Sequence, residues 1–381
     1  MKKKIIPIFV PHQGCPHDCI FCNQKKITGL STSMTDEDAR DIIIESLKTI
    51  PDDAEVEIAF FGGSFTAIDT YIQRKLLSVA KDFKDMGKVD DIRLSTRPDC
   101  IDDKELDLLK EYGVTIIELG VQSMNEDVLV KSIRGHHRDV VFTSAKMIKV
   151  AGFKLGLQMM LGLPGDSKDR CISTARDFVD IKPDFVRIYP TLVIKETGLE
   201  EELKSGRYRP FTIEECIDIS KRLMVIFYLN DIGVIRVGLQ ATEDIQLGLD
   251  VLAGPYHPAF RELVRSRMVR DYLDDVISRR YEEEGYDPSK GDNCQSFENG
   301  YVKIDKKDLL IKANPRDISM IVGDKRSNRE YINTKYMTRF KTMADKNLVD
   351  ELVVMIDGKL VDRITYKDLY IRLAKLYQLG W

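Results

Sequence analysis

Through its first 240 residues the chain alternates short apolar runs with longer amphipathic stretches. The amphipathic stretches, such as 36–48, 71–83, 104–112 and 140–150, have helical spacing. Repetition of strand and helix in this way is typical of parallel βαβ units. The pattern therefore predicts an α/β fold, a partial (β/α)6 barrel of the TIM type. The apolar runs, which we expect to be its strands, are residues 5–10, 56–61, 92–95, 115–119, 155–160 and 185–189.

Beyond the sixth run the pattern predicts a helix over 212–230, a strand over 233–238 and a long helix over 260–279. Residues 281–293 are polar and rich in Glu, Gly, Asp and Pro, which indicates a linker or an exposed loop. After it we expect strands at 301–311 and 352–356 and a helix at 365–378. We therefore predict a barrel domain with its extension over 1–280 and a small α+β domain over 281–381.

Composition places the chain among soluble proteins of a reducing compartment. Its net charge is −4, and no apolar run approaches the ~20 residues that a membrane span needs. The seven cysteines are odd in number and unevenly spread, which argues against a secreted disulfide framework. We expect a cytoplasmic protein that does not contact a membrane.

Three of the cysteines lie close together directly after the first predicted strand. Cys15, Cys19 and Cys22 have the spacing CxxxCxxC, and soft thiolates of this kind bind iron–sulfur clusters, zinc or copper(I). A closed structural site normally has four protein ligands, so three thiolates on a four-iron cluster leave one iron free for a small molecule. The alternative is a zinc site with His17 as the fourth ligand. Phe21, just before the third cysteine, is suited to packing on an adenine ring or shielding the cluster.

Other polar or glycine-rich positions follow the later predicted strands. The second strand ends in Gly62-Gly63-Ser64, where bare backbone lets a ligand approach closely, although a plain turn would look the same. Ser95 and Arg97 follow the third strand, and Gln122 follows the fourth. Arg134 has the planar fork that suits a carboxylate, the alternative being a surface ion pair. Gln158 lies in the fifth strand.

The cysteine motif together with these strand ends resembles the radical S-adenosylmethionine (SAM) superfamily. STRPD, ELGVQS, RGH, the GLPG turn, IYPTLVIKETGL, SGRYRP and GPYHPAFRELVRSR are similar to the radical domain of the Elongator catalytic subunit and its bacterial relatives. The resemblance covers residues 5–275. It departs from that group in its compact cysteine spacing, and no stretch after 280 has the pattern of an acetyl-coenzyme-A loop. The coproporphyrinogen oxidase family is a more distant relative.

The resemblance implies a 4Fe–4S cluster on Cys15, Cys19 and Cys22, with SAM as the second cofactor. It further implies that the glycines after the second strand contact the methionine amino group of SAM, and that Gln122 and Gln158 contact its ribose. Many relatives carry a glutamate where Ser95 stands. Phe21, Gly62, Gly63, Ser64, Ser95, Gln122, Arg134 and Gln158 are thus the expected SAM-binding residues.

The expected reaction is reductive cleavage of SAM to a 5′-deoxyadenosyl radical, with an electron donor such as ferredoxin or flavodoxin. The resemblance points to RNA, and to transfer RNA in particular, as a substrate. Residues 323–346 hold seven Lys/Arg and three Asp/Glu, with Tyr331, Tyr336 and Phe340 among them. Such a segment suits RNA, although an ordinary solvated segment with its aromatic rings turned inward is equally compatible. A small molecule such as a tetrapyrrole, or a non-enzymatic iron–sulfur or zinc module, are the alternatives.

Overall fold

The computed structural model describes residues 3–10, 15, 18–23, 34–239, 250–287, 295–298, 301–304 and 306–380. Its residues form two compact units, each described here by itself. The first contains residues up to Cys216 together with Asn230–Pro258, and the second contains Ile217–Leu229 and Ala259–Trp381. The predicted domain boundary near residue 280 stays a prediction.

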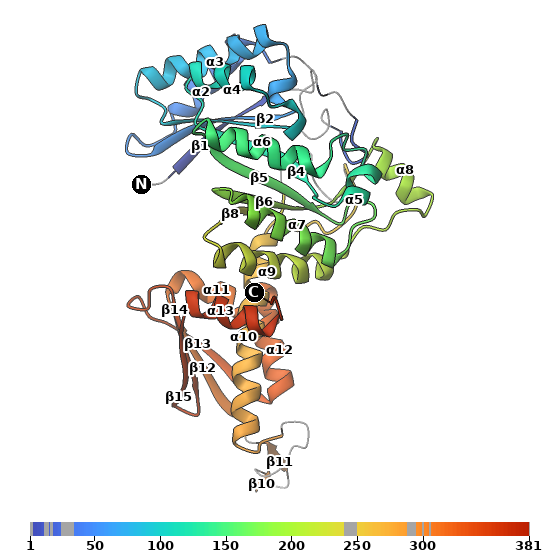
Figure 1. Ribbon diagram of the computed structural model, residues 1–381. Coiled ribbons are helices and arrows are strands. Elements are labelled where there is room, and N and C mark those ends of the chain that lie inside the picture. Colours follow the sequence, from blue (N-terminus) through green and yellow to red (C-terminus); the bar gives the residue numbers. More distant parts are fainter. Residues whose placement is uncertain are drawn as a thin grey trace. The chain divides into compact units, whose positions relative to one another are not determined.

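A seven-stranded parallel sheet forms the centre of the first unit (Figure 1). Neighbouring strands follow one another in the order β1-β2-β3-β4-β5-β6-β8, so the two edges, β1 and β8, are not paired and the barrel is partial. The predicted α/β fold is confirmed, with one more strand than the six repeats expected. The strands are β1 (Lys3–Val10), β2 (Glu55–Gly62), β3 (Asp91–Thr96), β4 (Ile116–Gln122), β5 (Lys154–Leu161), β6 (Phe185–Pro190) and β8 (Gly233–Val237).

The helices of the first unit follow the strands in the order that a βαβ pattern requires. Polar caps start several of them: the Thr35 hydroxyl accepts a hydrogen bond from the Asp38 amide at the first helix, and Asp102 does the same for Glu105. A short pair of strands, β7 (Val193–Ile194) and β9 (Val251–Ala253), stands apart from the sheet. The helices are α2 (Asp36–Leu47), α3 (Thr70–Asp85), α4 (Asp103–Glu111), α5 (Glu126–Lys131), α6 (Arg138–Val150), α7 (Lys168–Ile181) and α8 (Gly198–Lys204). Helix α9 (Ile213–Leu229) begins in the first unit and belongs from Ile217 onward to the second.

Alternation along the strands separates the two faces of the sheet. On β1, Ile6 and Ile8 are fully buried, whereas Ile5 and Phe9, which point to the opposite face, are 43% and 36% exposed. The face of Ile6 and Ile8 is the packed core against the helices, and the face of Phe9 is partly open.

The second unit is the small α+β fold that the sequence predicts. A four-stranded sheet of order β13-β12-β14-β15 lies together with the helices of this unit (Figure 1). The predicted strand 301–311 is two strands, β11 (Tyr301–Ile304), which pairs with β10 (Gln295–Glu298), and β12 (Lys307–Ala313). The remaining elements are α10 (Phe260–Glu283), α11 (Ile318–Val322), α12 (Ser327–Tyr336), β13 (Thr338–Ala344), β14 (Glu351–Ile356), β15 (Lys359–Thr365) and α13 (Tyr366–Leu376).

Among the helices of the described ranges, none combines the length and the apolar character needed to cross a bilayer.

Candidate functional site

The partly open face of the parallel sheet carries half-buried side chains near the carboxyl ends of its strands. Phe61 on β2, Ser95 on β3, Gln122 on β4, Gln158 on β5 and Tyr189 on β6 are all of intermediate exposure, whereas most of their strand neighbours are buried. In barrel-like α/β folds this end of the strands carries the ligand site. These five side chains therefore mark the candidate site.

A row of buried charges lies deeper on the same face. Arg93 on β3 forms ion pairs with Glu57 on β2 at 2.7 Å and with Glu118 on β4 at 2.5 Å, and Arg187 on β6 pairs with Glu118 at 2.9 Å. All four residues are at most 7% exposed. Buried charges are tolerated only when they are paired and hydrogen-bonded, and two acids against two guanidinium groups satisfy this condition. Single charges within the apolar runs were the sequence signal for this row, and the sequence analysis did not use it.

The row positions two of the predicted SAM contacts. The Gln158 amide donates to Glu118 Oε2 at 2.7 Å and to the Ser95 hydroxyl at 3.4 Å, so the structure brings Ser95 and Gln158 together across three strands. Arg187 donates to the Tyr189 hydroxyl at 3.2 Å. The buried charges thus hold the orientation of the polar groups above them.

The cysteine segment follows β1 and folds back on itself. Cys19 is 6% exposed, Cys15 and Cys22 are half-buried, and the Cys22 amide donates to the Cys19 carbonyl at 2.9 Å. Ile20 fastens the segment on both sides, because its amide donates to the Ser132 carbonyl at 3.1 Å and its carbonyl accepts from the Leu199 amide at 2.7 Å. The segment is therefore tied to the end of α5 and to the start of α8.

Two buried guanidinium groups face the thiol of Cys19. Arg134 Nη1 lies 3.3 Å and Arg97 Nη1 lies 3.8 Å from Cys19 Sγ, and the two arginines are 6% and 2% exposed. The Arg97 fork is held by Asp99 through two hydrogen bonds of 2.9 Å, and Arg134 Nη2 donates to the Gly120 carbonyl. Arg134 is thus no surface ion-pair residue: it is fixed beside a cysteine.

The charges around this thiol are strongly coupled. Burial alone would lower the pKa of Arg97, but Asp99 and then the thiols of Cys19 and Cys15 hold that pKa above its usual value. Burial would raise the pKa of Asp99, and the hydrogen bonds from Arg97 hold it below its usual value. Burial, helped by the charge of Arg134, lowers the pKa of His136 to about 4, so this imidazole is neutral at pH 7.

The donor set of the cysteine segment suits a four-iron cluster, because such a cluster binds each cysteine at a different iron and the sulfur atoms need not meet at one point. No three His, Cys, Asp or Glu side chains of the described ranges gather closely enough to hold one ion. His17, the fourth ligand of the zinc alternative, lies outside the described residues. The two guanidinium groups beside Cys19 Sγ are donors that a cluster-bound sulfur accepts. The assignment of Cys15, Cys19 and Cys22 as the ligands stays a prediction.

Gly62, Gly63 and Ser64 close the second strand next to the end of the first. Gly62 has φ +111°, and a Cβ there would lie 2.4 Å from the Val10 carbonyl oxygen, so only glycine fits. The Gly63 amide donates to the same carbonyl at 3.2 Å. Ser64 is buried, 2.8 Å from the Thr96 hydroxyl, and accepts from the Arg97 amide. These residues shape the site, and direct contact with SAM stays a prediction for each.

Gln122 and Phe21 have contrasting surroundings. Gln122 has φ +73°, rare for a non-glycine residue and typical of functional strain, and its buried Oε1 has no hydrogen-bond partner in the described chain. An orphan acceptor of this kind suits a ribose hydroxyl. Phe21 packs against the buried cluster of Val193, Leu199 and Tyr208.

The basic segment 323–346 is not a row of exposed rings. Tyr336 and Phe340 are 3% and 4% exposed, so the inward alternative holds for both. Tyr331 is covered by Arg270 at 4.5 Å and by Lys335 at 5.5 Å from the ring centre. Of the cysteines outside the motif, Cys171 and Cys216 are buried as expected, Cys100 is half-buried, and Cys294 lies outside the described residues.

Two protein families match consecutive parts of the chain. Residues 9–178 match the radical SAM superfamily, and residues 183–270 match the radical SAM C-terminal domain. The cofactors of that superfamily are a 4Fe–4S cluster and SAM, as the sequence resemblance predicted.

Curated relatives and a solved structure agree with this assignment. Elongator complex protein 3 of Bos taurus is 33% identical over 246 residues, which is 59% of this chain and 44% of that protein. The tRNA uridine(34) acetyltransferase of Methanocaldococcus jannaschii is 27% identical over 56% of this chain and 47% of its own length. The chain thus spans about half the length of these relatives. The archaeal Methanocaldococcus infernus Elp3 with N-terminus deletion (1–46) has a similar fold, with a TM-score of 0.55 at 23% identity over 75% of this chain and 65% of that one.

Proposed function

Because this chain belongs to the radical SAM superfamily, we propose that it is a radical SAM enzyme whose substrate is RNA, and transfer RNA in particular. The relatives support the substrate, because the tRNA uridine(34) acetyltransferase of Methanocaldococcus jannaschii is named for its action on transfer RNA and matches 56% of this chain. The proposal concerns the radical reaction alone and includes no acetyl transfer. An external one-electron donor such as ferredoxin or flavodoxin, and a cytoplasmic location, belong to the same proposal.

Cys15, Cys19 and Cys22 would hold the cluster, and the observation that carries this assignment is the pair of guanidinium groups on Cys19. When bound, the cluster supplies the electron that cleaves SAM into methionine and a 5′-deoxyadenosyl radical. Arg97 and Arg134 stabilise the negative thiolate, and Asp99 fixes the orientation of Arg97. The ties of Ile20 to Ser132 and Leu199 hold the segment in place over the open face of the sheet.

Within this proposal, the half-buried polar groups on the open face bind SAM. Gln122 offers its unpaired amide oxygen, and Gln158 and Ser95 lie side by side on neighbouring parts of the sheet. Gly63 leaves backbone groups accessible next to the end of β1. Phe21 and Arg134 complete the predicted set on the side of the cysteine segment. The buried charge row below them excludes water and keeps these contacts rigid.

The enzymatic part of the proposal is tested by cofactor cleavage. Anaerobically reconstituted protein should release 5′-deoxyadenosine from SAM on reduction with dithionite, and Cys19→Ala should abolish that release. Cys216→Ala is the matched control, because this cysteine is fully buried in the first unit and is not part of the CxxxCxxC motif. Release of 5′-deoxyadenosine by Cys19→Ala at the rate of the wild type would reject the ligand assignment.

The RNA part is tested separately by mass spectrometry of nucleosides. Transfer RNA from a deletion strain should lack a modified nucleoside that returns with the wild-type gene but not with the Cys19→Ala gene. An unchanged nucleoside profile, together with intact SAM cleavage, would reject RNA and favour a small-molecule substrate.

A further inference from the structure

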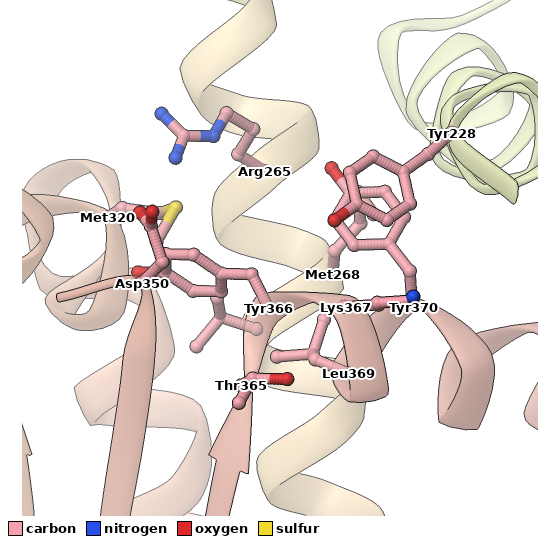
Figure 2. A pocket seen from close by; sticks show the side chains of 11 residues that line it. Tyr228, Arg265, Met268, Met320, Asp350, Thr365, Tyr366, Lys367, Leu369 and Tyr370 are labelled. Carbon is pink, nitrogen blue, oxygen red and sulfur yellow. The ribbon is translucent and has the colours of Figure 1, made fainter. Parts of the chain in front are cut away.

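A pocket of about 370 Å³ opens in the second unit, and none of the residues that the proposed reaction uses lines it. Side chains of α10, α11, α13, the Ile217–Leu229 segment and the ends of β14 and β15 line it (Figure 2). Its volume falls within the range of small-ligand sites.

Two tyrosines form one wall of the pocket. The rings of Tyr228 and Tyr370 are stacked, with centroids 4.1 Å apart and planes 23° apart. Figure 2 shows them on one side of the pocket, with Tyr366, Asp350 and Arg265 on the other. The described residues provide no hydrogen bond to the hydroxyl of Tyr228 or of Tyr370. Both hydroxyls are therefore available as donors to a ligand.

The opposite wall has a third phenol, Tyr366. Its hydroxyl is buried beside the carboxylate of Asp317, whose Oδ2 also lies 3.6 Å from Arg316 Nε. Burial and the Asp317 carboxylate together raise the pKa of Tyr366, so this hydroxyl keeps its proton. Tyr366 therefore contributes its ring surface to the wall, and its hydroxyl is directed to Asp317.

Arg265 supplies a cation above these rings. Among the described residues its ion-pair partner is Glu262 at 3.6 Å, and its side chain is 34% exposed, which leaves most donors of the guanidinium fork accessible. Burial raises the pKa of Tyr370, and the positive charges of Arg265 and Arg261 oppose that rise, which places these cations near the Tyr370 hydroxyl. The acid on this side, Asp350, is already paired with Arg316. The accessible charge is therefore cationic.

Apolar side chains form the rest of the lining. Met268 and Met320 are 2% and 5% exposed, and Leu369 lies beside them. Methionine and tyrosine surfaces accept a flat ring, whereas an arginine fork accepts a phosphate. From this combination we propose that the pocket binds a nucleotide, with its phosphate at Arg265 and its base against the apolar side chains and the Tyr228–Tyr370 wall, where the two hydroxyls donate hydrogen bonds to it. The nucleotide is either free or an unpaired nucleotide of an RNA.

Isothermal titration calorimetry on the full reconstituted chain tests this proposal without SAM cleavage, so its outcome is independent of the proposed reaction. The probes are AMP, UMP, inorganic phosphate and an unstructured oligoribonucleotide. A nucleoside monophosphate should bind more tightly than inorganic phosphate. Arg265→Gln should weaken its binding about tenfold or more, since a charge-assisted contact is lost, and Tyr370→Phe should weaken it severalfold.

The matched control is Arg279→Gln, which removes the same charge from the same helix about 21 Å along its axis. Arg279 is 64% exposed and pairs only with Asp275 on its own helix, so this variant should bind as the wild type does. Circular dichroism confirms that each variant is folded.

The mononucleotide and oligoribonucleotide titrations distinguish a free nucleotide from a nucleotide of an RNA. Oligonucleotide binding that Arg265→Gln weakens would identify RNA, and nucleotide binding without oligonucleotide binding would identify a free nucleotide. No binding of any nucleotide, equal binding of phosphate and nucleotide, or equal affinities of Arg265→Gln and Arg279→Gln would overturn the proposal.

Discussion

At the scale of single residues, the environment of Cys19 determines what the cysteine segment can do. Hydrogen bonds and positive charge at a ligand sulfur stabilise the more negative, reduced state of an iron–sulfur cluster. Arg134 and Arg97 supply both the hydrogen bonds and the positive charge, because their Nη1 atoms lie 3.3 and 3.8 Å from Cys19 Sγ. If Cys19 binds the proposed cluster, this pair would raise the potential at which the cluster accepts its electron.

The first prediction follows from this geometry. Arg134→Gln should lower the cluster potential by roughly 50 mV, because the loss of about 1 kcal/mol of stabilisation corresponds to that shift in a one-electron couple. A redox titration followed by electron paramagnetic resonance measures it. Arg74→Gln, an exposed arginine on α3, is the control and should leave the potential unchanged. Equal potentials for both variants would show that the guanidinium contact does not tune the cluster.

The second prediction concerns pH and His136. Its pKa is about 4 in the fold and ordinarily 6.5, so between these values the unfolded chain binds a proton that the folded chain does not. The stability that the neutral imidazole provides is thus complete above pH 6.5 and falls as the pH drops toward 4. From pH 7 to pH 5 the loss should be about 2 kcal/mol.

Urea unfolding of the wild type and of His136→Gln at pH 7 and pH 5 measures this loss of stability. The decline in unfolding free energy between pH 7 and pH 5 should be smaller in the variant by that amount. An equal decline in both proteins would mean that His136 is not the group that titrates.

Sequence reasoning at this scale found side chains but not their partners. Ser95 and Gln158 were predicted as neighbours of one cofactor, and the structure joins them by a hydrogen bond. Arg134 was predicted to face a carboxylate, yet it contacts the Cys19 thiol and the Gly120 carbonyl. The contact between Arg134 and Cys19 depends on how the cysteine segment is placed next to β4 in the fold. The spacing of motifs along the chain does not predict that placement.

At the scale of elements, several motifs of the family resemblance have a structural role that only the fold shows. Leu199, in the string IYPTLVIKETGL, donates its amide to Ile20 of the cysteine segment. Gly198 in the same string is required there, since a Cβ would lie 2.9 Å from Ile20 Cγ1. Tyr208, in SGRYRP, donates to the Gly162 carbonyl of the GLPG turn at 2.6 Å. These motifs fasten the site together.

The third prediction tests the junction of β1 and β2. Gly62→Ala should destabilise the protein by about 3 kcal/mol, because it adds a Cβ clash with the Val10 carbonyl to the cost of a positive φ. Thermal unfolding and iron content measure the effect, and both should fall. Gly87→Ala is the control: it also has a positive φ, but its Cβ would meet nothing within 4 Å. Equal losses of stability in the two variants would mean that the positive φ alone causes the effect. The predicted clash with the Val10 carbonyl would then be rejected.

Two strands that the sequence pattern did not predict are in the second unit. Strand β15 carries Asp362 and Arg363 and lacks a continuous apolar run, although the Asp357-Gly358 pair before it, with φ +49° and +75°, is a typical hairpin turn and was a usable signal. Strand β13 lies in the basic segment and pairs in parallel with β12. Tertiary packing, and not the local sequence pattern, determines that this segment forms a strand.

At the scale of the whole molecule, the radical SAM match ends at residue 270, whereas the second compact unit continues to the end of the chain. The alternating pattern of the first 240 residues predicted the first unit well, because parallel sheets demand long apolar runs and regular crossovers. The pocket at Arg265 had no sequence signal, since Tyr228, Arg265 and Tyr370 come from three distant segments. Only the fold of the second unit brings them together.

The central claim is a four-iron cluster held by three cysteines, with one iron left for SAM. Mössbauer spectra of the anaerobically reconstituted, iron-57-labelled protein test it most directly. On addition of SAM, one of the four iron sites should change its isomer shift while the other three stay as they were. Four sites that remain alike with and without SAM, or a protein that assembles no such cluster, would contradict the account.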